Sequence, residues 1–501
     1  MPGCNFFTRL RSLLLCVCAL SALLLTNTAM AQDSLPDLVE AGNIEAALEL
    51  IADGVDVNQP SVDGTTALHW AVYRKEVDLV ERLLEQGANP DTSNDYYATP
   101  MTVAAVHGEF DIMKALLEAG VDPESANQDG QTLLMAVTRT GHVDTAELLL
   151  EHGANVDARE NWGGQTALMW AASQSQPDMV QLLVSAGADV DARGKDNAWP
   201  RYITSEPRNK PLDPGGYTPL LYAAREGCMD CITALLEGGA DIDLPDLWGQ
   251  TPLLMATLNM HWDAADLLIE RGADIHRWDW WGRTALYNAI DLNLLTSSRR
   301  GDLPSTDELS GLDIARILLD RGINVDMRLK KEPPFRSGGD RGYTDGSPDA
   351  RVLSGGATAL HKAAKAGDIE AVELLLSYGA NVHAANKVYE VTPMLTAGGV
   401  WRVYGIFMEY PISGEFKTGA DAVTIMKMLQ EAGADIHGVA ANGQNIVHGS
   451  AKAGWNEALQ FAWEQGVDFQ ARDVGGMTPR DLAVKMGHTE TVEFIDALLD
   501  N

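Results

Sequence analysis

The chain has 501 residues, of which 46% are hydrophobic and 22% are charged, and this composition excludes wholesale disorder. Its 71 acidic residues outnumber its 37 basic residues and give a formal net charge of −34, so its surface repels phosphate backbones and anionic membranes. We therefore expect no nucleic-acid partner, and we attribute the acidity to solubility rather than to a specific cationic ligand.

Residues 1–31 are predicted to form a secretory signal peptide. Two arginines precede an apolar run over residues 13–25, and the Ala-Met-Ala of residues 29–31 offers the small side chains of a cleavage site. The run has 13 residues, whereas a membrane-crossing helix needs about 20. We expect the mature chain, residues 32–501, to be periplasmic or secreted and to have no membrane span after cleavage. Retention of the segment as an uncleaved anchor is the alternative.

After residue 62 the chain repeats itself. An apolar phrase that opens with threonine, once with asparagine, recurs eleven times, and its successive starting points are separated by 33, 33, 34, 52, 33, 33, 74, 34, 53 and 33 residues. The starting residues are Thr66, Thr99, Thr132, Thr166, Thr218, Thr251, Thr284, Thr358, Thr392, Asn445 and Thr478. A Gly-Ala-Asp or Gly-Ala-Asn phrase follows most copies, directly after a pair of leucines, where glycine is expected to end a helix.

Each copy predicts two short helices. The threonine can cap the first helix, whose apolar face is exemplified by Leu68, Ala71 and Val72. After a tight turn, a second helix such as 143–150 follows and ends at glycine. One such unit cannot bury its apolar faces alone, so the units are expected to stack into a solenoid.

The 33-residue period and the phrase Thr66-Ala67-Leu68-His69 resemble ankyrin repeats. The resemblance covers nearly all of residues 34–501 and implies an all-α solenoid of stacked helix-turn-helix units with β-hairpin-like turns. Residues 34–62 read as a degenerate N-terminal capping unit and residues 474–501 as a polar C-terminal capping unit.

Four insertions interrupt the array, near residues 194–216, 293–310, 327–356 and 398–420. The first and third fall in turns between units, and the second and fourth fall between the two helices of one unit. The first insertion is locally basic. The fourth contains the aromatic stretch 401–410, which we expect to dock on the array rather than to contact a partner.

The histidines do not form a catalytic set. His69, His361 and His448 occupy the fourth position of the repeated phrase, where the resemblance implies a structural role. The sequence contains no metalloprotease, phosphate-loop or nucleophile-elbow motif, so we expect no catalytic residues, no bound metal and no cofactor.

Two of the five cysteines, Cys228 and Cys231, lie outside the signal segment. They flank the start of a predicted second helix, and an exported protein could join them in a disulfide. The alternative is two small side chains at tolerant repeat positions.

Aromatic residues provide the main functional signal. The resemblance implies that binding residues lie at the turn tips and on the concave side of the first helices. The predicted binding residues at these positions are Trp70, Tyr96, Trp162, Trp170, Tyr222, Trp248, Trp280, Trp281 and Arg283. They favour a groove over roughly residues 62–285 that grips an extended peptide or a protein surface, because aromatic residues and arginine are enriched at binding hot spots. Packing of these rings on neighbouring turns is the alternative.

The function expected from these observations is a non-enzymatic protein-binding scaffold. A receptor for a glycan or small molecule that uses the same rings is the second hypothesis. An enzyme assembled from the insertions is the third, and it lacks any nucleophile–base or metal-ligand spacing.

Overall fold

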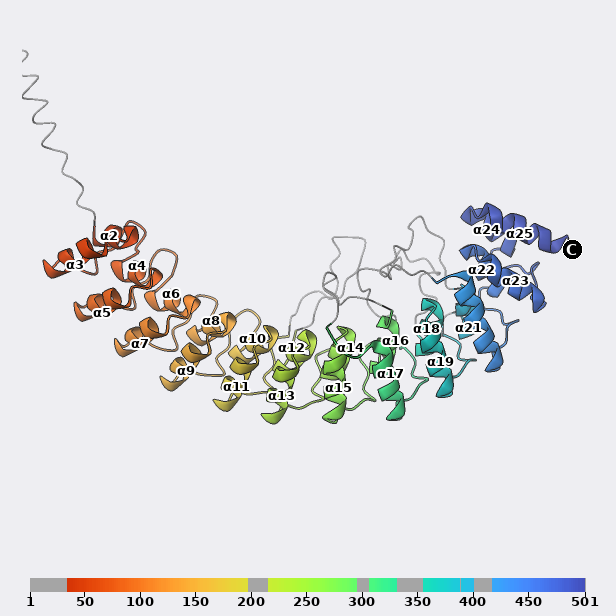
Figure 1. Cartoon of the computed structure of the whole chain (residues 1–501), viewed down its shortest axis with the longest axis horizontal. Helices are drawn as coiled ribbons and strands as arrows, with labels where there is room; N and C mark the ends of the chain where they lie inside the picture. Colours follow the sequence, from red (N-terminus) through yellow and green to blue (C-terminus); the bar gives the residue numbers. More distant parts are fainter. Residues whose placement is uncertain are drawn as a thin grey trace, which may run out of the picture. The chain divides into compact units, whose positions relative to one another are not determined.

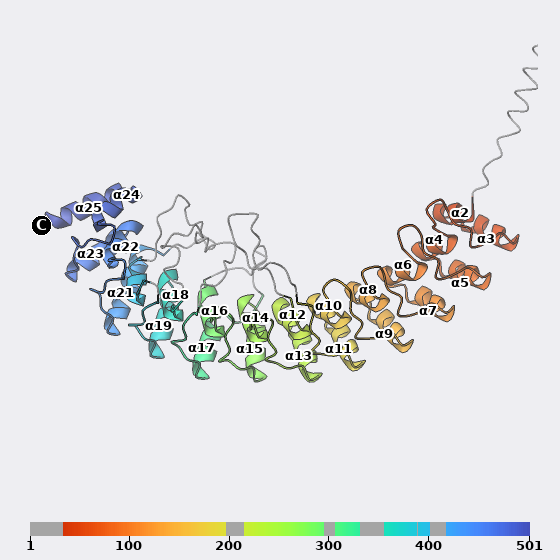
Figure 2. The same cartoon turned by 180° about the vertical axis from the view of Figure 1, so that it is seen from behind.

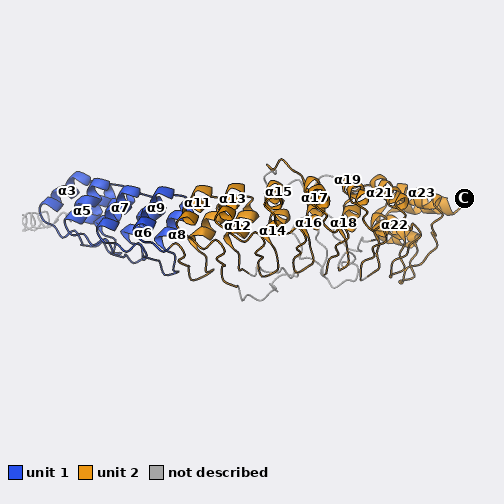
Figure 3. Cartoon of the chain, turned by 90° about the horizontal axis from the view of Figure 1, so that it is seen from below, with its two compact units in different colours: residues 1–155 blue, residues 156–501 orange. Residues whose placement is uncertain are grey.

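A computed structural model describes residues 34–196, 215–294, 306–330, 355–387, 389–400 and 417–500. The predicted signal peptide, the central part of each predicted insertion and the aromatic stretch 401–410 lie outside these residues. The chain divides into two compact units, residues 1–155 and residues 156–501, which Figure 3 distinguishes by colour.

Unit 1 contains four helix pairs that follow one another in chain order (Figure 1). Its helices are α2 (Leu35–Ala41), α3 (Ile44–Ala52), α4 (Ala67–Tyr73), α5 (Val77–Glu85), α6 (Pro100–His107), α7 (Phe110–Glu118), α8 (Leu133–Thr140) and α9 (Val143–Glu151). The first helix of each pair packs on the first helix of the next pair, and the second helices pack likewise. The described part of unit 1 therefore has two helical layers.

Unit 2 continues the same pattern (Figures 1 and 2). Its helices are α10 (Ala167–Ser173), α11 (Pro177–Ser185), α12 (Pro219–Glu226), α13 (Met229–Glu237), α14 (Pro252–Leu258), α15 (Trp262–Glu270), α16 (Ala285–Leu292), α17 (Gly311–Asp320), α18 (Ala359–Ala366), α19 (Ile369–Ser377), α20 (Pro393–Ala397), α21 (Gly419–Glu431), α22 (Ile446–Ala453), α23 (Asn456–Glu464), α24 (Pro479–Met486) and α25 (Thr489–Leu499). Consecutive first helices pack together from α10 to α24, so each repeat of unit 2 contacts the repeats that precede and follow it in the sequence.

The prediction of an all-α solenoid is confirmed. Within the described ranges the turns form no strand and contribute only the isolated bridges Ala126–Thr132 and Asp196–Gly215. The same residues include no helix with the length and hydropathy needed to cross a membrane.

Local chemistry explains where the helices begin and end. The hydroxyl of Thr132 accepts a hydrogen bond from the backbone N–H of Met135, which satisfies a donor that the first turn of α8 leaves unpaired. Helix α6 ends at Gly108, whose φ of 66° is left-handed and whose missing Cβ makes room for the ring of His142.

The core lies between the two layers and between successive pairs. Leu68, Ala71 and Val72 are buried as predicted, and Leu79, Val80 and Leu83 of the second helix α5 are buried against the same interior. At the C-terminal end of unit 2, Arg480 of α24 pairs with Asp496 of α25 at the surface of the terminal repeat.

Candidate binding surfaces

Several turns before the first helices are held by one acceptor side chain near the start of the turn. In unit 2, a carboxylate oxygen of Asp279 accepts the N–H groups of Trp281 at 3.0 Å and Arg283 at 2.9 Å. Asp246 does the same for Trp248 and Gln250, with both distances 2.8 Å. These side chains substitute for backbone partners in the turn, so the tip is fixed locally.

The turn at residues 160–165 is one residue longer than the turns that begin at Asp246 and Asp279. Its acceptor is a glutamate, whose side chain is longer than that of aspartate and spans the extra residue. Glu160 lies six residues before its threonine instead of five, and its carboxylate accepts N–H groups of Trp162, Gly163 and Gln165. These acceptors were not among the residues predicted from the sequence. Their signal was present as Asp or Asn five residues before several of the repeated threonines, and as Glu160 six residues before Thr166.

Backbone hydrogen bonds join neighbouring tips. The N–H of Trp280 donates to the carbonyl of Trp248 at 2.7 Å, and the N–H of Lys330 donates to the carbonyl of Trp281 at 2.8 Å. The backbone of these tips is therefore fixed by hydrogen bonds within its own turn and by a hydrogen bond to a neighbouring repeat.

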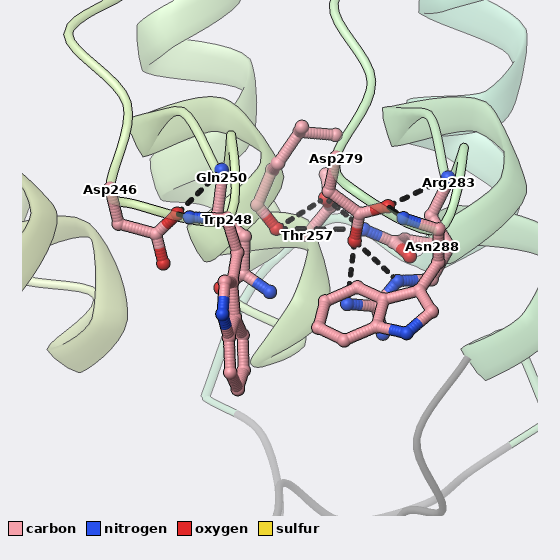
Figure 4. A network of polar contacts seen from close by, with 9 residues as sticks. Asp246, Trp248, Gln250, Thr257, Asp279, Arg283 and Asn288 are labelled. Carbon is pink, nitrogen blue, oxygen red and sulfur yellow. Dashed lines mark hydrogen bonds and ion pairs between the residues drawn. The ribbon is translucent and has the colours of Figure 1, made fainter. Parts of the chain in front are cut away.

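The four tryptophans predicted as binding residues at the tips of unit 2 divide into two exposed and two packed side chains. Trp162 is 79% exposed and Trp280 is 52% exposed. Trp248, which Figure 4 shows together with Asp246 and Gln250, is half-buried. Trp281 is buried, and the rings of Trp248 and Trp281 meet edge to face with centroids 4.9 Å apart. The structure thus places Trp162 and Trp280 where a partner can reach them, and Trp248 and Trp281 where they support the tips.

Arg283 belongs to the supporting part of the tip. Its side chain is only 5% exposed, it contacts Asp279 at 2.6 Å, and its guanidinium lies 4.9 Å from the centre of the Trp281 ring. The buried ion pair satisfies both charges, so in this arrangement Arg283 positions Trp281.

On the exposed side of the first helices of unit 2, two predicted binding residues are connected. The indole N–H of Trp170 on α10 donates to the side-chain oxygen of Gln165 at 3.0 Å, and the amide of Gln165 donates to the hydroxyl of Tyr222 on α12 at 2.6 Å. The guanidinium of Arg225 lies 4.9 Å from the centre of the Tyr222 ring. Two aromatic rings, an amide and a guanidinium thus form a row, which consists of Trp170, Gln165, Tyr222 and Arg225.

Unit 1 has its own aromatic surface. Trp70 on α4 is half-buried and packs edge to face on Tyr73, which in turn packs edge to face on His107 of α6. Tyr96 stands at the next turn tip, where the side-chain oxygen of Asn94 accepts its N–H at 3.0 Å. Tyr96 is 76% exposed, so it is accessible to a partner.

The repeat family follows from comparison with known sequences. A model described as "Ankyrin repeats (3 copies)" matches residues 37–127, 119–194, 201–279 and 220–329, and a model described as "Ankyrin repeat" matches residues 355–387. Together these matches cover more than half of the chain. The chain is an ankyrin repeat protein.

Two curated relatives match short stretches of the chain. The potassium channel AKT1 of Arabidopsis thaliana is 38% identical over 69 residues, which is 14% of this chain and 8% of the channel. The palmitoyltransferase Hip14 of Drosophila melanogaster is 38% identical over 76 residues, which is 14% of this chain and 12% of that protein. The chain therefore spans only a small part of the length of these relatives.

Two solved ankyrin domains align with about half of the chain. The ankyrin repeat domain of human ASB11 is 26% identical, with a TM-score of 0.39, and the match covers 48% of this chain and 99% of that domain. The ankyrin repeat domain of Bcl-3 is 28% identical, with a TM-score of 0.40 and the same two coverages.

The ankyrin histidines hold neighbouring repeats together. In unit 1, Nδ1 of His69 lies 2.8 Å from the hydroxyl of Thr66, and Nε2 lies 3.0 Å from the carbonyl of Ala98 in the next turn. His361 makes the equivalent contacts with Thr358 and Val391. Burial lowers the pKa of His69 and lowers the pKa of His361 to about 4, so both rings are neutral at neutral pH.

The described residues contain no group of three or more histidine, cysteine or acidic side chains that could hold a metal ion. Cys228 and Cys231 form a disulfide at the start of α13, with Cα atoms 5.2 Å apart. The cysteine pair thus adopts the bonded state of the two states left open by the sequence.

Proposed function

We propose that this ankyrin protein is a non-enzymatic scaffold that binds an extended peptide or a protein surface through its turn tips and first-helix faces. Ankyrin repeats mediate protein binding, and the ankyrin fold is typically non-enzymatic. The observation that carries the proposal is the exposure of Trp162 and Trp280 on tips fixed by Glu160 and Asp279.

Exposed indoles on a rigid base suit binding for a physical reason. A tryptophan offers a large contact area with few rotatable bonds, and a fixed tip loses little conformational freedom when a partner docks. Packing on a neighbouring tip accounts for the positions of Trp248 and Trp281, whereas Trp162 and Trp280 are 79% and 52% exposed.

Selection from a random peptide-display library tests the scaffold proposal. We expect the full chain to enrich peptides, and the double substitution Trp162→Ala and Trp280→Ala to weaken the affinity of those bound by unit 2 by about tenfold or more. Tyr378→Ala is a matched control, because Tyr378 is an exposed aromatic residue at the end of the second helix α19. Unchanged affinity in the double variant, with an unchanged circular dichroism spectrum, would rule out these tips as the binding surface.

A receptor for a glycan or small molecule is the second candidate. The row formed by Trp170, Gln165 and Tyr222 favours it, because aromatic faces beside amide and hydroxyl groups suit sugar rings. A glycan array probed with the same chain distinguishes the two candidates: specific glycan binding that Trp170→Ala removes, without peptide enrichment, would favour the receptor.

We also propose that residues 1–31 direct export and that the protein acts in the periplasm or outside the cell. The support is the arrangement of charge, apolar run and small residues, together with a disulfide that persists in oxidising compartments. Cell fractionation followed by N-terminal sequencing should find a chain that begins at Gln32 outside the cytoplasm. A cytoplasmic chain that retains Met1 would overturn the proposal.

A further inference from the structure

The tip at Tyr97 in unit 1 departs from the glycine pattern of the neighbouring tips, as the tip at Glu390 does in unit 2. The position two residues before the repeated threonine is glycine in the neighbouring tips, Gly64 and Gly130, with φ of 81° and 74°. Tyr97 adopts the same left-handed conformation, with φ of 60°. A bulky residue is rare in this region of backbone space because its Cβ is crowded there.

Packing does not compensate for the strained backbone of Tyr97. Its side chain is 65% exposed, and the adjacent Tyr96 is exposed as well. The tip itself is fixed, because Asn94 accepts the N–H groups of Tyr96 and Ala98, and the N–H of Asp95 donates to the carbonyl of Asp63. Two tyrosine rings are therefore held in solvent at a local energetic cost, which is a property of functional sites.

The two rings border a hollow of about 350 Å³ that lies entirely within unit 1. We call it the tyrosine hollow. Besides Tyr96 and Tyr97, its lining includes Val106 on α6, Asp129 at the next tip and Arg139 on α8. It therefore combines aromatic faces, an apolar side chain and two opposite charges.

The acidic charge of the protein is denser in unit 1, which contains this hollow, than in unit 2. Residues 34–155 contain 22 acidic and 5 basic side chains, whereas residues 156–501 contain 48 acidic and 30 basic side chains. Unit 1 thus carries a formal charge of −17 over about a third of the length of unit 2, which carries −18. The sequence alone favours solubility as the reason for the acidity, whereas the higher charge density of unit 1 also attracts cationic partners to this unit.

We infer that the tyrosine hollow binds an extended, lysine- or arginine-rich polypeptide segment. Cationic side chains are attracted to the faces of the Tyr96 and Tyr97 rings, and the carboxylates of Asp95 and Asp129 lie at the same two tips. The inference rests on the proposed function, that these tips bind polypeptide, and it adds the chemistry of the partner for unit 1.

Arg139 makes the sign of the partner's charge testable. It is the one basic residue that lines the hollow, and no described residue makes an ion pair or hydrogen bond with its guanidinium. For a cationic segment, Arg139→Glu replaces repulsion by attraction and should tighten binding roughly threefold or more. For an anionic segment, the same substitution should weaken binding.

The experiment uses the full chain and a random peptide-display library, followed by fluorescence polarisation with the synthesised peptides. Tyr97→Gly restores the residue found in the neighbouring tips and relieves the strain, so a loss of binding cannot be ascribed to misfolding. We expect this variant to bind lysine- or arginine-rich peptides about tenfold more weakly. Glu390→Gly, the same change at a tip of unit 2, is the matched control and should leave this binding unchanged.

The outcomes separate the inference from the proposed function. Enriched basic peptides that lose affinity with Tyr97→Gly and with added salt, and gain affinity with Arg139→Glu, support the inference. Enrichment of acidic or neutral peptides alone, or basic peptides indifferent to Tyr97→Gly, overturns it and leaves the scaffold proposal standing. Failure to enrich any peptide overturns both.

Discussion

Acidification is expected to destabilise the repeat that contains His361. The ring of His361 is fully buried, and its Nδ1 lies 3.2 Å from the backbone nitrogen of Thr358. Because that N–H can only donate, Nδ1 must accept, and the ring proton lies on Nε2, which donates to the carbonyl of Val391 at 3.0 Å. A second proton would remove the hydrogen bond that Nδ1 accepts and would place a charge in the core.

The magnitude follows from the pKa of His361. Burial is the main reason that the pKa falls from 6.5 to about 4, and the charge of Arg328 lowers it further, while the contacts with the carbonyls of Val391 and Ala384 oppose the shift. A lowered pKa in the folded state means that the unfolded chain binds the proton more tightly. The contribution to stability is therefore fully present above pH 6.5 and is lost as the pH falls towards 4. At about 1.4 kcal/mol per pKa unit, the loss is about 3 kcal/mol.

His361→Met isolates this effect. Methionine occupies the equivalent buried position in two other repeats, as Met135 and Met169, so the fold accommodates it. At neutral pH the variant should be less stable by about 1–3 kcal/mol, because it loses the hydrogen bonds of the imidazole. At pH 4 the difference should vanish or reverse, because only the parent chain has lost the histidine contribution.

Hydrogen exchange of the amides in α18 and α19 is the appropriate assay, because a repeat array opens locally rather than as one cooperative unit. Protection factors corrected for intrinsic exchange are compared at each pH between the parent chain and the variant. His383→Asn serves as a control at an exposed histidine of the same repeat region. Parallel pH profiles for the parent chain and His361→Met would refute the reasoning.

Three further predictions follow from individual contacts. Burial and the nearby charge of Asp274 raise the pKa of Asp243, which means that the ionised carboxylate is disfavoured at this position. Asp243→Asn removes the charge and keeps an acceptor for the N–H of Asp274, so it should raise the thermal midpoint slightly at neutral pH. A lower midpoint would contradict this. A Cβ at Gly108 would lie 2.1 Å from the ring of His142 at a φ of 66°, so Gly108→Ala should cost at least about 1 kcal/mol in denaturant unfolding, and an unchanged midpoint would contradict the close approach. Under unfolding conditions, the peptide that contains Cys228 and Cys231 should react with a thiol reagent only after reduction, and labelling of both cysteines beforehand would exclude the disulfide.

The repeat and its helices were predictable from the sequence. The threonine caps, the apolar positions and the terminal glycines recur with a 33-residue period, and each acts over only a few residues. Local chemistry of this kind is visible in a sequence, so the second helix predicted over residues 143–150 agrees with α9, Val143–Glu151, to within one residue.

The roles of the aromatic residues were decided by the tertiary structure. Trp280 and Trp281 are adjacent and identical in type, yet one is exposed and the other is buried beside Trp248 of the preceding tip. A tryptophan supports a tip when a ring of a neighbouring repeat packs on it, as Trp248 packs on Trp281. These two residues are 33 positions apart in the chain. In the same way, the sequence placed Tyr97 one residue after a predicted binding position, but only the backbone conformation revealed that a tyrosine occupies a site suited to glycine. The period of the chain thus determined the scaffold, and contacts between neighbouring repeats determined which side chains remain accessible on it.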